Sequence, residues 1–203
     1  MSAAALTATL TALAGAAVIL PQIVRVLRLQ SAAGVAVAGL QGSVWGYTGW
    51  LIYTARGGGG WSFLALAVPA ALQATNLLVV LARGGDRRGS TAILTVGASV
   101  CVTVAIGPLD RAVWILLAMG ALAYLPTVLS AWRAPAIHGV SRTAWTLSGL
   151  HALGWGAHGL AIGDAFVVAN GAVNVTGSIL VLLATCVRHD VWRRPLDTSP
   201  GLR

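Results

Sequence analysis

Seven apolar segments, each about as long as a membrane-spanning helix, occupy most of this 203-residue chain. They cover residues 4–24, 35–55, 62–82, 91–107, 112–131, 143–162 and 165–187, and charged or turn-forming residues separate them. A helix needs about 20 mostly apolar residues to cross the hydrocarbon core of a bilayer. The sequence therefore predicts an all-α membrane protein with seven transmembrane helices and little chain left for any other domain.

The composition excludes an ordinary soluble protein. Apolar residues make up 57% of the chain and charged residues only 9%, whereas soluble domains carry about 25% charged residues. The two cysteines, Cys101 and Cys186, lie in apolar segments. They are too few for a disulfide framework, and we expect them to behave as small apolar residues.

Arginines are distributed unevenly along the chain. All 13 basic residues are arginine, and 11 of them follow the first, third or fifth segment or lie in the C-terminal tail; the other two are Arg56 and Arg111. Short cytoplasmic loops are rich in basic residues. We therefore expect a multi-pass protein of the cell membrane (plasma or inner) with its N-terminus outside and its C-terminus in the cytoplasm. The net charge of +8 then indicates contact with anionic lipid headgroups, and no nucleic acid is expected as a partner.

An internal repeat relates the first three segments to the last three. Residues 13–55 match residues 118–160 at an offset of 105, and a later offset of 98 aligns Asn76 with Asn174. The matched pairs include Leu20-Pro21 with Leu125-Pro126, Gly34-Val35 with Gly139-Val140, and Gly49-Trp50 with Gly154-Trp155. Pro, Gly and Trp are matched here, and these types are harder to match by chance than alanine.

The fourth segment has no partner in this comparison. Three helices reverse the direction of the chain, so one extra helix is needed for the second triplet to insert in the same orientation as the first. We therefore predict two parallel three-helix repeats joined by a linker helix, an architecture known among transporters. The expected units are a first repeat at 1–88, a linker transmembrane helix at 89–110, a second repeat at 111–188 and a basic cytoplasmic tail at 189–203.

Polar residues form a stripe along one face of the sixth segment. Helical spacing places Ser148, His151, Trp155 and His158 within about 80° of arc. The repeat aligns them with Ser43, Gly46, Trp50 and Tyr53, and the two asparagines lie halfway along their own segments. Polar groups within a bilayer usually face the bundle interior or a water-filled cavity. The candidate solute-binding residues are Trp50, Trp155, Asn76, Asn174, Ser43, Ser148, Tyr53, His151 and His158.

The residue types in this stripe suit a small neutral solute. An indole face matches the C–H surface of a sugar ring, and a carboxamide offers both a donor and an acceptor to hydroxyl groups. The alternative is structural, with tryptophans that anchor the helices at the membrane interface and asparagines that join helices. The sequence shows no nucleophile–base pair, so we expect no enzyme and no catalytic residue.

The two histidines of the stripe lie about 10 Å apart along the helix axis. That separation is too large for two ligands of one metal ion, and no cysteine or acidic residue is nearby in the sequence to complete a site. We therefore expect no metal and no cofactor. His151 and His158 are either neutral and hydrogen-bonded to neighbours or part of a proton relay.

Leu20-Pro21-Gln22 at the end of the first segment, with Gly34-Val35 opening the second, resembles a PQ-loop motif. Together with the repeat, the 3+1+3 segment count and the outside N-terminus, it resembles the SWEET branch of the PQ-loop superfamily. The resemblance implies a facilitative sugar transporter that works by alternating access. By position, Trp50, Trp155, Asn76 and Asn174 would contact the solute, and Pro21, Gln22 and Pro126 would form a hinge. The second repeat departs from the motif with Pro126-Thr127, and the second and sixth segments contain no proline.

Three functions follow from these expectations. The leading one is a uniporter that moves a small neutral solute, with a sugar as the favoured class, through a central cavity lined by Trp and Asn. The first alternative is a proton-coupled transporter of an amino acid or another metabolite that uses His151 or His158. The second is a PQ-loop receptor that binds without transport. One chain holds both repeats and can complete a cavity alone. A homo-oligomer is compatible with this arrangement but is not required by it.

Overall fold

The computed structural model describes residues 3–57 and 60–193, and this part of the chain is helical. The helices are α1 (Ala3–Leu29), α2 (Val37–Arg56), α3 (Gly60–Ala82), α4 (Ser90–Ile106), α5 (Leu109–Arg133), α6 (Arg142–Ile162), α7 (Ala165–Val187) and the short α8 (His189–Arg193). Among the described residues, β-type pairing is limited to one isolated bridge between Ala36 and Asp86. The prediction of an all-α chain built on seven long helices is confirmed.

The largest difference from the predicted segments is at the C-terminal end of α1. Helix α1 continues to Leu29, so Arg25 and Arg28 lie within its last turns instead of in a loop. Arginine is a good helix former, so α1 continues beyond the point where its apolar run ends.

The segment assigned to a cytoplasmic tail begins with structure. Helix α8 places the indole of Trp192 against the bundle, where its Nε1 donates to the carbonyl of Val140 at 3.0 Å. The guanidinium groups of Arg25 and Arg142 lie 4.4 and 4.0 Å from the centre of the indole ring. The residues of α8, at the start of the segment predicted as a tail, therefore pack against the bundle through partners that are distant in the sequence. The rest of that segment, 194–203, lies outside the described residues.

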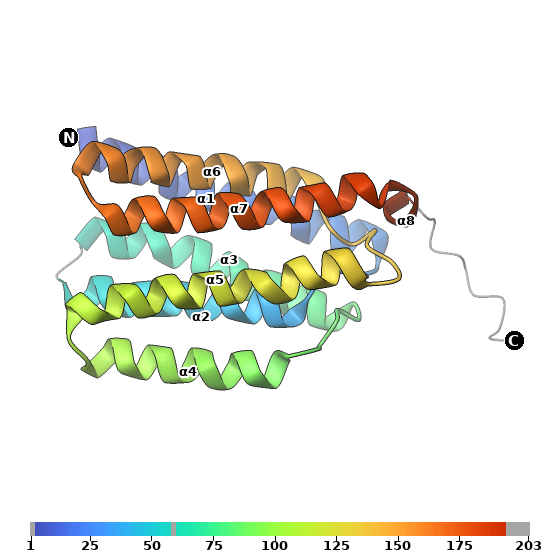
Figure 1. Cartoon of the computed structure of the whole chain (residues 1–203), viewed down its shortest axis with the longest axis horizontal. Coiled ribbons are helices and arrows are strands. Elements are labelled where there is room, and N and C mark those ends of the chain that lie inside the picture. Colours follow the sequence, from blue (N-terminus) through green and yellow to red (C-terminus); the bar gives the residue numbers. More distant parts are fainter. Residues whose placement is uncertain (1–2, 58–59, 194–203) are drawn as a thin grey trace, which may run out of the picture.

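Six helices form a closed ring in the order α1, α3, α2, α5, α7 and α6, and α6 contacts α1 again. Helix α4 lies outside the ring against α2 and α5 (Figure 1). The third helix of each triplet lies between the first and the second. Within the described residues, helices at opposite positions of the ring do not contact each other, and these pairs are α1 with α5, α2 with α6, and α3 with α7. The ring therefore encloses an interior region between opposite helices.

The largest buried cluster lies at the end of the ring where the α1–α2 and α5–α6 connections meet. Its members are Val26, Ala32, Val35, Val37, Val80, Ala131, Ile137, Val140, Val181 and Ala184. Two smaller clusters join α2, α4 and α5. The end that carries most of the arginines therefore holds the largest buried apolar cluster.

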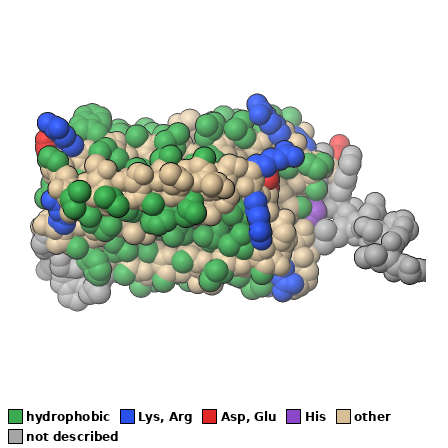
Figure 2. Space-filling model, turned by 90° about the horizontal axis from the view of Figure 1, so that it is seen from below, with side chains coloured by type: hydrophobic (Ala, Val, Ile, Leu, Met, Phe, Trp, Pro, Cys, Tyr) green, Lys and Arg blue, Asp and Glu red, His purple; other side chains and the backbone are tan. Residues whose placement is uncertain are grey.

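The outer surface of the bundle is rich in apolar side chains. Figure 2 shows hydrophobic side chains spread over one face, with arginines near its two ends. By length and hydropathy, two helices of the described part, α5 and α7, could cross a bilayer, and only 28% and 22% of their apolar windows are buried. The apolar stretches Leu66–Ala82 and Ser90–Ile106 are shorter. Two exposed apolar helices are weak evidence for a membrane, and the crossing by all seven stays a prediction.

Candidate functional site

Tyr124 of α5 projects into the interior of the ring. Its ring packs edge-on against Trp145 of α6, with centroids 6.0 Å apart, and it lies near Tyr47 of α2. Because α2 and α6 stand at opposite positions of the ring and do not contact each other, a side chain that is close to both lies between them. Gly177 of α7 makes room for the phenol, since a Cβ at that position would lie 2.1 Å from a Tyr124 ring carbon.

A hydrogen-bond network starts from this phenol. The Tyr124 hydroxyl donates to Oδ1 of Asn174 at 2.7 Å. The Nδ2 of Asn174 donates to the backbone carbonyl of Asn170 at 2.6 Å and lies 3.2 Å from its side-chain oxygen. The hydroxyls of Ser148 and Ser178 lie beside the phenol and 3.2 Å from each other. Two of the predicted site residues, Asn174 and Ser148, thus belong to one interior network that joins α5, α6 and α7.

Asn76 has a different environment from the asparagine that the repeat aligns with it. It lies on a buried stripe of α3 with Pro69, Gln73 and Val80, and only 3% of its surface is exposed. Its Oδ1 is buried and has no hydrogen-bond partner. Helices α3 and α7 do not contact each other, so the two asparagines belong to opposite sides of the ring.

The aromatic residues of the α6 stripe lie together. The Nε1 of Trp155 donates to Nε2 of His151 at 3.0 Å, and the His158 ring packs edge-on against Trp155 at 5.9 Å. An imidazole nitrogen that accepts a hydrogen bond carries no proton, so neutral His151 holds its proton on Nδ1. Gly15 of α1 faces this ring, and a Cβ there would lie 3.2 Å from the His151 Nε2.

The predicted residues of α2 make contacts of another kind. Trp50 and Tyr53 pack edge-on with ring centroids 5.5 Å apart, and both contact the cluster of α4 and α5 residues around Leu116. The Ser43 hydroxyl donates to the Gly39 carbonyl of its own helix at 3.1 Å. The structure does not bring Trp50 to Trp155, because α2 and α6 occupy opposite positions of the ring.

The predicted hinge residues lie at the arginine-rich end. Pro21 is inside α1 and Pro126 is inside α5. The side chain of Gln22 bridges to the α5–α6 connection, where its Nε2 donates to the Gly139 carbonyl at 2.7 Å and its Oε1 accepts from the Ser141 amide at 2.9 Å. Gln22 therefore fastens the first triplet to the second.

The α1–α2 and α5–α6 connections interlock around this bridge. The Gly139 amide donates to the Ala33 carbonyl at 3.0 Å, and the Ser130 hydroxyl donates to the Gly34 carbonyl at 3.1 Å. Gly34 has a φ of +80°, and a Cβ there would lie 2.6 Å from the Cα of Ile137. Only glycine allows the α1–α2 and α5–α6 connections to approach each other this closely.

His138 is the titratable group of this junction. The Nε of Arg25 donates to the His138 carbonyl at 2.6 Å, and the Ser31 hydroxyl lies 2.9 Å from its Nε2. The imidazole is 8% exposed, and its Nδ1 is buried without a hydrogen-bond partner. Burial lowers the pKa of His138, and the charge of Arg25 lowers it further.

Sequence reasoning missed Tyr124, Tyr47 and Asn170. Tyr124 directly precedes Leu125-Pro126, where the first repeat has Ile19 before Leu20-Pro21. A comparison that looks only for identical residues does not mark this position, because the two repeats carry different residues there. A tyrosine in the middle of an apolar segment was the available signal, because a buried phenol usually finds a hydrogen-bond partner.

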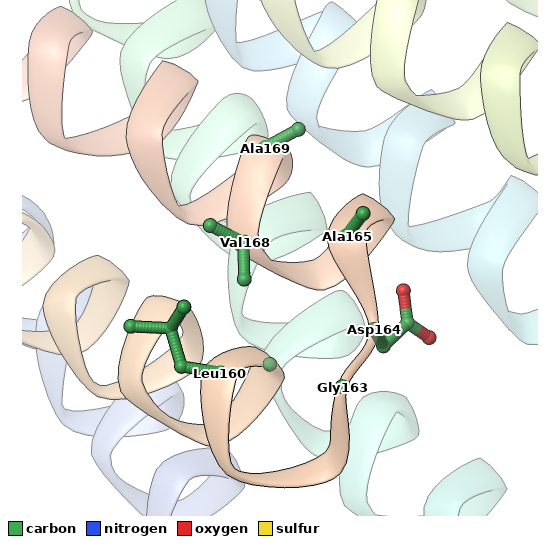
Figure 3. A pocket seen from close by; sticks show the side chains of 7 residues that line it. Leu160, Gly163, Asp164, Ala165, Val168 and Ala169 are labelled. Carbon is green, nitrogen blue, oxygen red and sulfur yellow. The ribbon is translucent and has the colours of Figure 1, made fainter.

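A surface hollow lies apart from this interior network. It has a volume of about 410 Å³ and is lined by Gly159, Leu160, Gly163, Asp164, Ala165, Val168 and Ala169 at the α6–α7 turn (Figure 3). The Asp164 carboxylate accepts from the amides of Phe166 and Val167 at 2.8 and 3.1 Å, which caps α7. The carboxylate is thus engaged in holding the helix end.

A scan against protein-family models, a search of curated proteins and a search of solved structures each found no match to this chain. The resemblance to the PQ-loop superfamily therefore rests on the residues quoted from the sequence. Among the described residues, no group of three His, Cys, Asp or Glu side chains could hold a metal ion.

Proposed function

We propose that this protein is an integral membrane facilitator that moves a small neutral solute, with a sugar as the leading class, through the interior of the six-helix ring. One observation carries the proposal: the network around Tyr124 and Asn174 and the buried Asn76 lie inside a bundle that exposes many large apolar side chains, some of them on the face in Figure 2. Lipid accepts such an exterior, and polar groups at membrane depth line paths for solutes.

The proposed architecture is two parallel three-helix repeats, α1–α3 and α5–α7, joined by the linker helix α4. Two features support it. The third helix lies between the other two in both triplets, and the helices that the repeat aligns stand opposite each other across the ring. A two-fold axis along the ring would produce both features. We place the arginine-rich end in the cytoplasm of a cell-membrane protein.

Alternating access would then be a rocking of one triplet against the other. The arginine-rich end is closed in this conformation by Gln22 and the interlocked connections. Opening it requires α1 to leave the α5–α6 connection and the two Gln22 hydrogen bonds to break. Pro21 precedes Gln22, and a proline removes one helix hydrogen bond, so α1 can bend most easily beside the bridge.

A second candidate is proton-coupled transport of an amino acid or another metabolite. The bond from Trp155 to the Nε2 of His151 favours it. A proton that binds this Nε2 removes the acceptor and releases the indole, so protonation would change the shape of the interior. Transport that responds to an imposed pH gradient would distinguish this mechanism from uniport.

The first test is counterflow in proteoliposomes loaded in turn with unlabelled sugars, polyols and amino acids. We expect sugar counterflow that Trp155→Ala and Asn76→Ala each reduce at least about tenfold, the loss expected for about one strong contact. Trp114→Ala is the matched control, because Trp114 is 60% exposed on the outside of α5 and packs against Phe166.

Each other outcome of this test has a definite meaning. Flux that a pH gradient drives, and that His151→Gln makes insensitive to it, would replace uniport with proton coupling. A folded protein that moves none of these solutes would overturn transport and leave a receptor that binds without moving its ligand.

A further inference from the structure

The two aligned asparagines are not equivalent acceptors. The Oδ1 of Asn174 accepts a hydrogen bond from the Tyr124 hydroxyl at 2.7 Å, and its Nδ2 donates to the Asn170 carbonyl. The Oδ1 of Asn76 is buried and receives no hydrogen bond. A buried carbonyl oxygen without a partner is costly and rare, so each case in a native protein calls for an explanation.

The residue aligned with Tyr124 explains the difference. Leu20-Pro21 aligns with Leu125-Pro126, so Ile19 takes the position of Tyr124 in the first triplet. Ile19 is buried, with 5% of its surface exposed, and its side chain has no hydrogen to donate. The hydrogen bond that completes Asn174 therefore has no counterpart at Asn76.

We propose that the interior binding site is one-sided. Tyr124 is a positioning residue that keeps Asn174 engaged within the protein, and the free Oδ1 of Asn76 accepts a hydrogen bond from the solute. The inference rests on the proposed transport function and adds the solute class: the cargo carries a neutral O–H or N–H donor that points toward α3. A solute whose group at that point only accepts hydrogen bonds leaves Asn76 unpaired and binds poorly.

The arrangement also sets how the solute is oriented. On the α7 side the amide oxygen of Asn174 already accepts one hydrogen bond, so a donor placed there relieves no unpaired acceptor. On the α3 side the orphan acceptor of Asn76 is available. The solute donor is therefore directed to one of the two aligned positions, although the framework around it repeats.

Thermal stability of the purified protein tests the pairing without any transport. Asn→Leu keeps nearly the same side-chain shape, and removing an unpaired acceptor is neutral or stabilising, whereas removing a paired one leaves its donor unsatisfied. We expect Asn76→Leu to leave the melting temperature unchanged or raised. Asn174→Leu and Tyr124→Phe should each lower it by roughly 2–4 °C, with little further loss when the two are combined. Equal losses for Asn76→Leu and Asn174→Leu would overturn the proposal.

Solute discrimination tests the role of the free acceptor. The probes are D-glucose and its monodeoxy analogues, each lacking one hydroxyl. For the native protein, we expect at least one analogue to inhibit D-glucose counterflow about tenfold more weakly than unlabelled D-glucose, the effect of one hydrogen bond. Asn76→Leu should abolish this ratio. Tyr124→Phe should reduce it, because the released Asn174 oxygen offers a second acceptor.

A control and two negative results complete the design. Trp114→Ala should leave the ratio unchanged, because Trp114 is 60% exposed on the outside of α5. A general structural defect would lower the transport rate for all sugars and keep the ratio. Native counterflow with identical inhibition by every analogue would overturn the one-sided site, whereas absence of counterflow for every solute class would overturn the proposed function itself.

Discussion

At the scale of single residues, His138 links the closed end of the ring to pH. Its neutral imidazole fits a buried position beside Ser31 and Arg25. A proton on the unpaired Nδ1 would add a buried cation next to the partly buried Arg25 and a donor without an acceptor. The folded protein therefore favours neutral His138, which agrees with the lowered pKa of this group.

The expected consequence is a loss of stability in acid. Unfolding restores the ordinary pKa of about 6.5, so the unfolded chain binds the proton more readily. The stability from neutral His138 is fully present above that value and is lost as the pH falls toward the lower pKa of the folded protein. Melting temperatures in detergent between about pH 5 and pH 8 should show this decline. His138→Gln should flatten it.

Serine and tyrosine hydroxyls behave differently at this scale. Ser43 and Thr48 bond to carbonyls of their own helix, a local solution open to any such residue in a helix. Tyr124 cannot reach its own backbone and bonds to another helix. A single hydroxyl in an apolar segment therefore carries little information about a site, and a tyrosine carries more.

At the scale of elements, the α1–α6 contact at the arginine-rich end depends on Gln22. Its amide satisfies a carbonyl and an N–H of the α5–α6 connection, Gly139 and Ser141, at once. Both groups are buried and would be left without this partner if the side chain were removed. The aligned residue in the second repeat is Thr127, which a Cβ on Gly39 would contact, so the α2–α5 side closes by direct packing.

We expect Gln22→Leu to destabilise the closed end by about 1–3 kcal/mol, the cost of buried polar groups left unpaired. Hydrogen exchange should then become faster in the α1–α2 and α5–α6 connections and remain unchanged in α4. Gln30→Ala is the control, because Gln30 makes an exposed bond to Leu27 of its own helix end. Unchanged exchange in both connections would show that Gln22 does not hold this end closed.

At the scale of the whole molecule, the proposed orientation places the α3–α4 connection in the cytoplasm and the α6–α7 turn outside the cell. The described structure offers two matched reporters, Gly84 in the α3–α4 connection and Gly163 at the α6–α7 turn. Both have a φ near +70° to +76°, and a Cβ at either position meets nothing within 4 Å. A cysteine at either position is therefore equally strained and equally accessible.

In a Cys101→Ala, Cys186→Ala background, we expect an impermeant maleimide added to intact cells to label Gly163→Cys and to leave Gly84→Cys unlabelled. Permeabilised cells should give label at both. The reverse pattern would invert the orientation, and equal labelling of intact cells would contradict a membrane between the two turns. The expected labelling pattern follows from the positive-inside rule, which applies to short basic loops such as those of this chain.

Much of the fold was predictable because its signal is local. Hydropathy located all seven long helices, and the helix bounds follow the apolar runs closely, as with α7 at Ala165–Val187. The repeat also pointed to Asn76, Asn174 and Ser148. It did not reveal the partners of these residues, because a hydrogen bond such as that between Tyr124 and Asn174 joins positions 50 residues apart.

The sequence by itself determined the helical class, the helix lengths, the uneven charge and the aligned positions, since each depends on residues near one another in the chain. Only the tertiary structure decided the order of helices around the ring, the packing of Trp50 against α4 and α5, the bridge from Gln22, and the placement of Trp192 between two arginines. The physical reason is the same in each case. Aligned residues share a local pattern, but their hydrogen bonds depend on which neighbour the ring supplies, and Ile19 and Tyr124 make that neighbour different in the two halves.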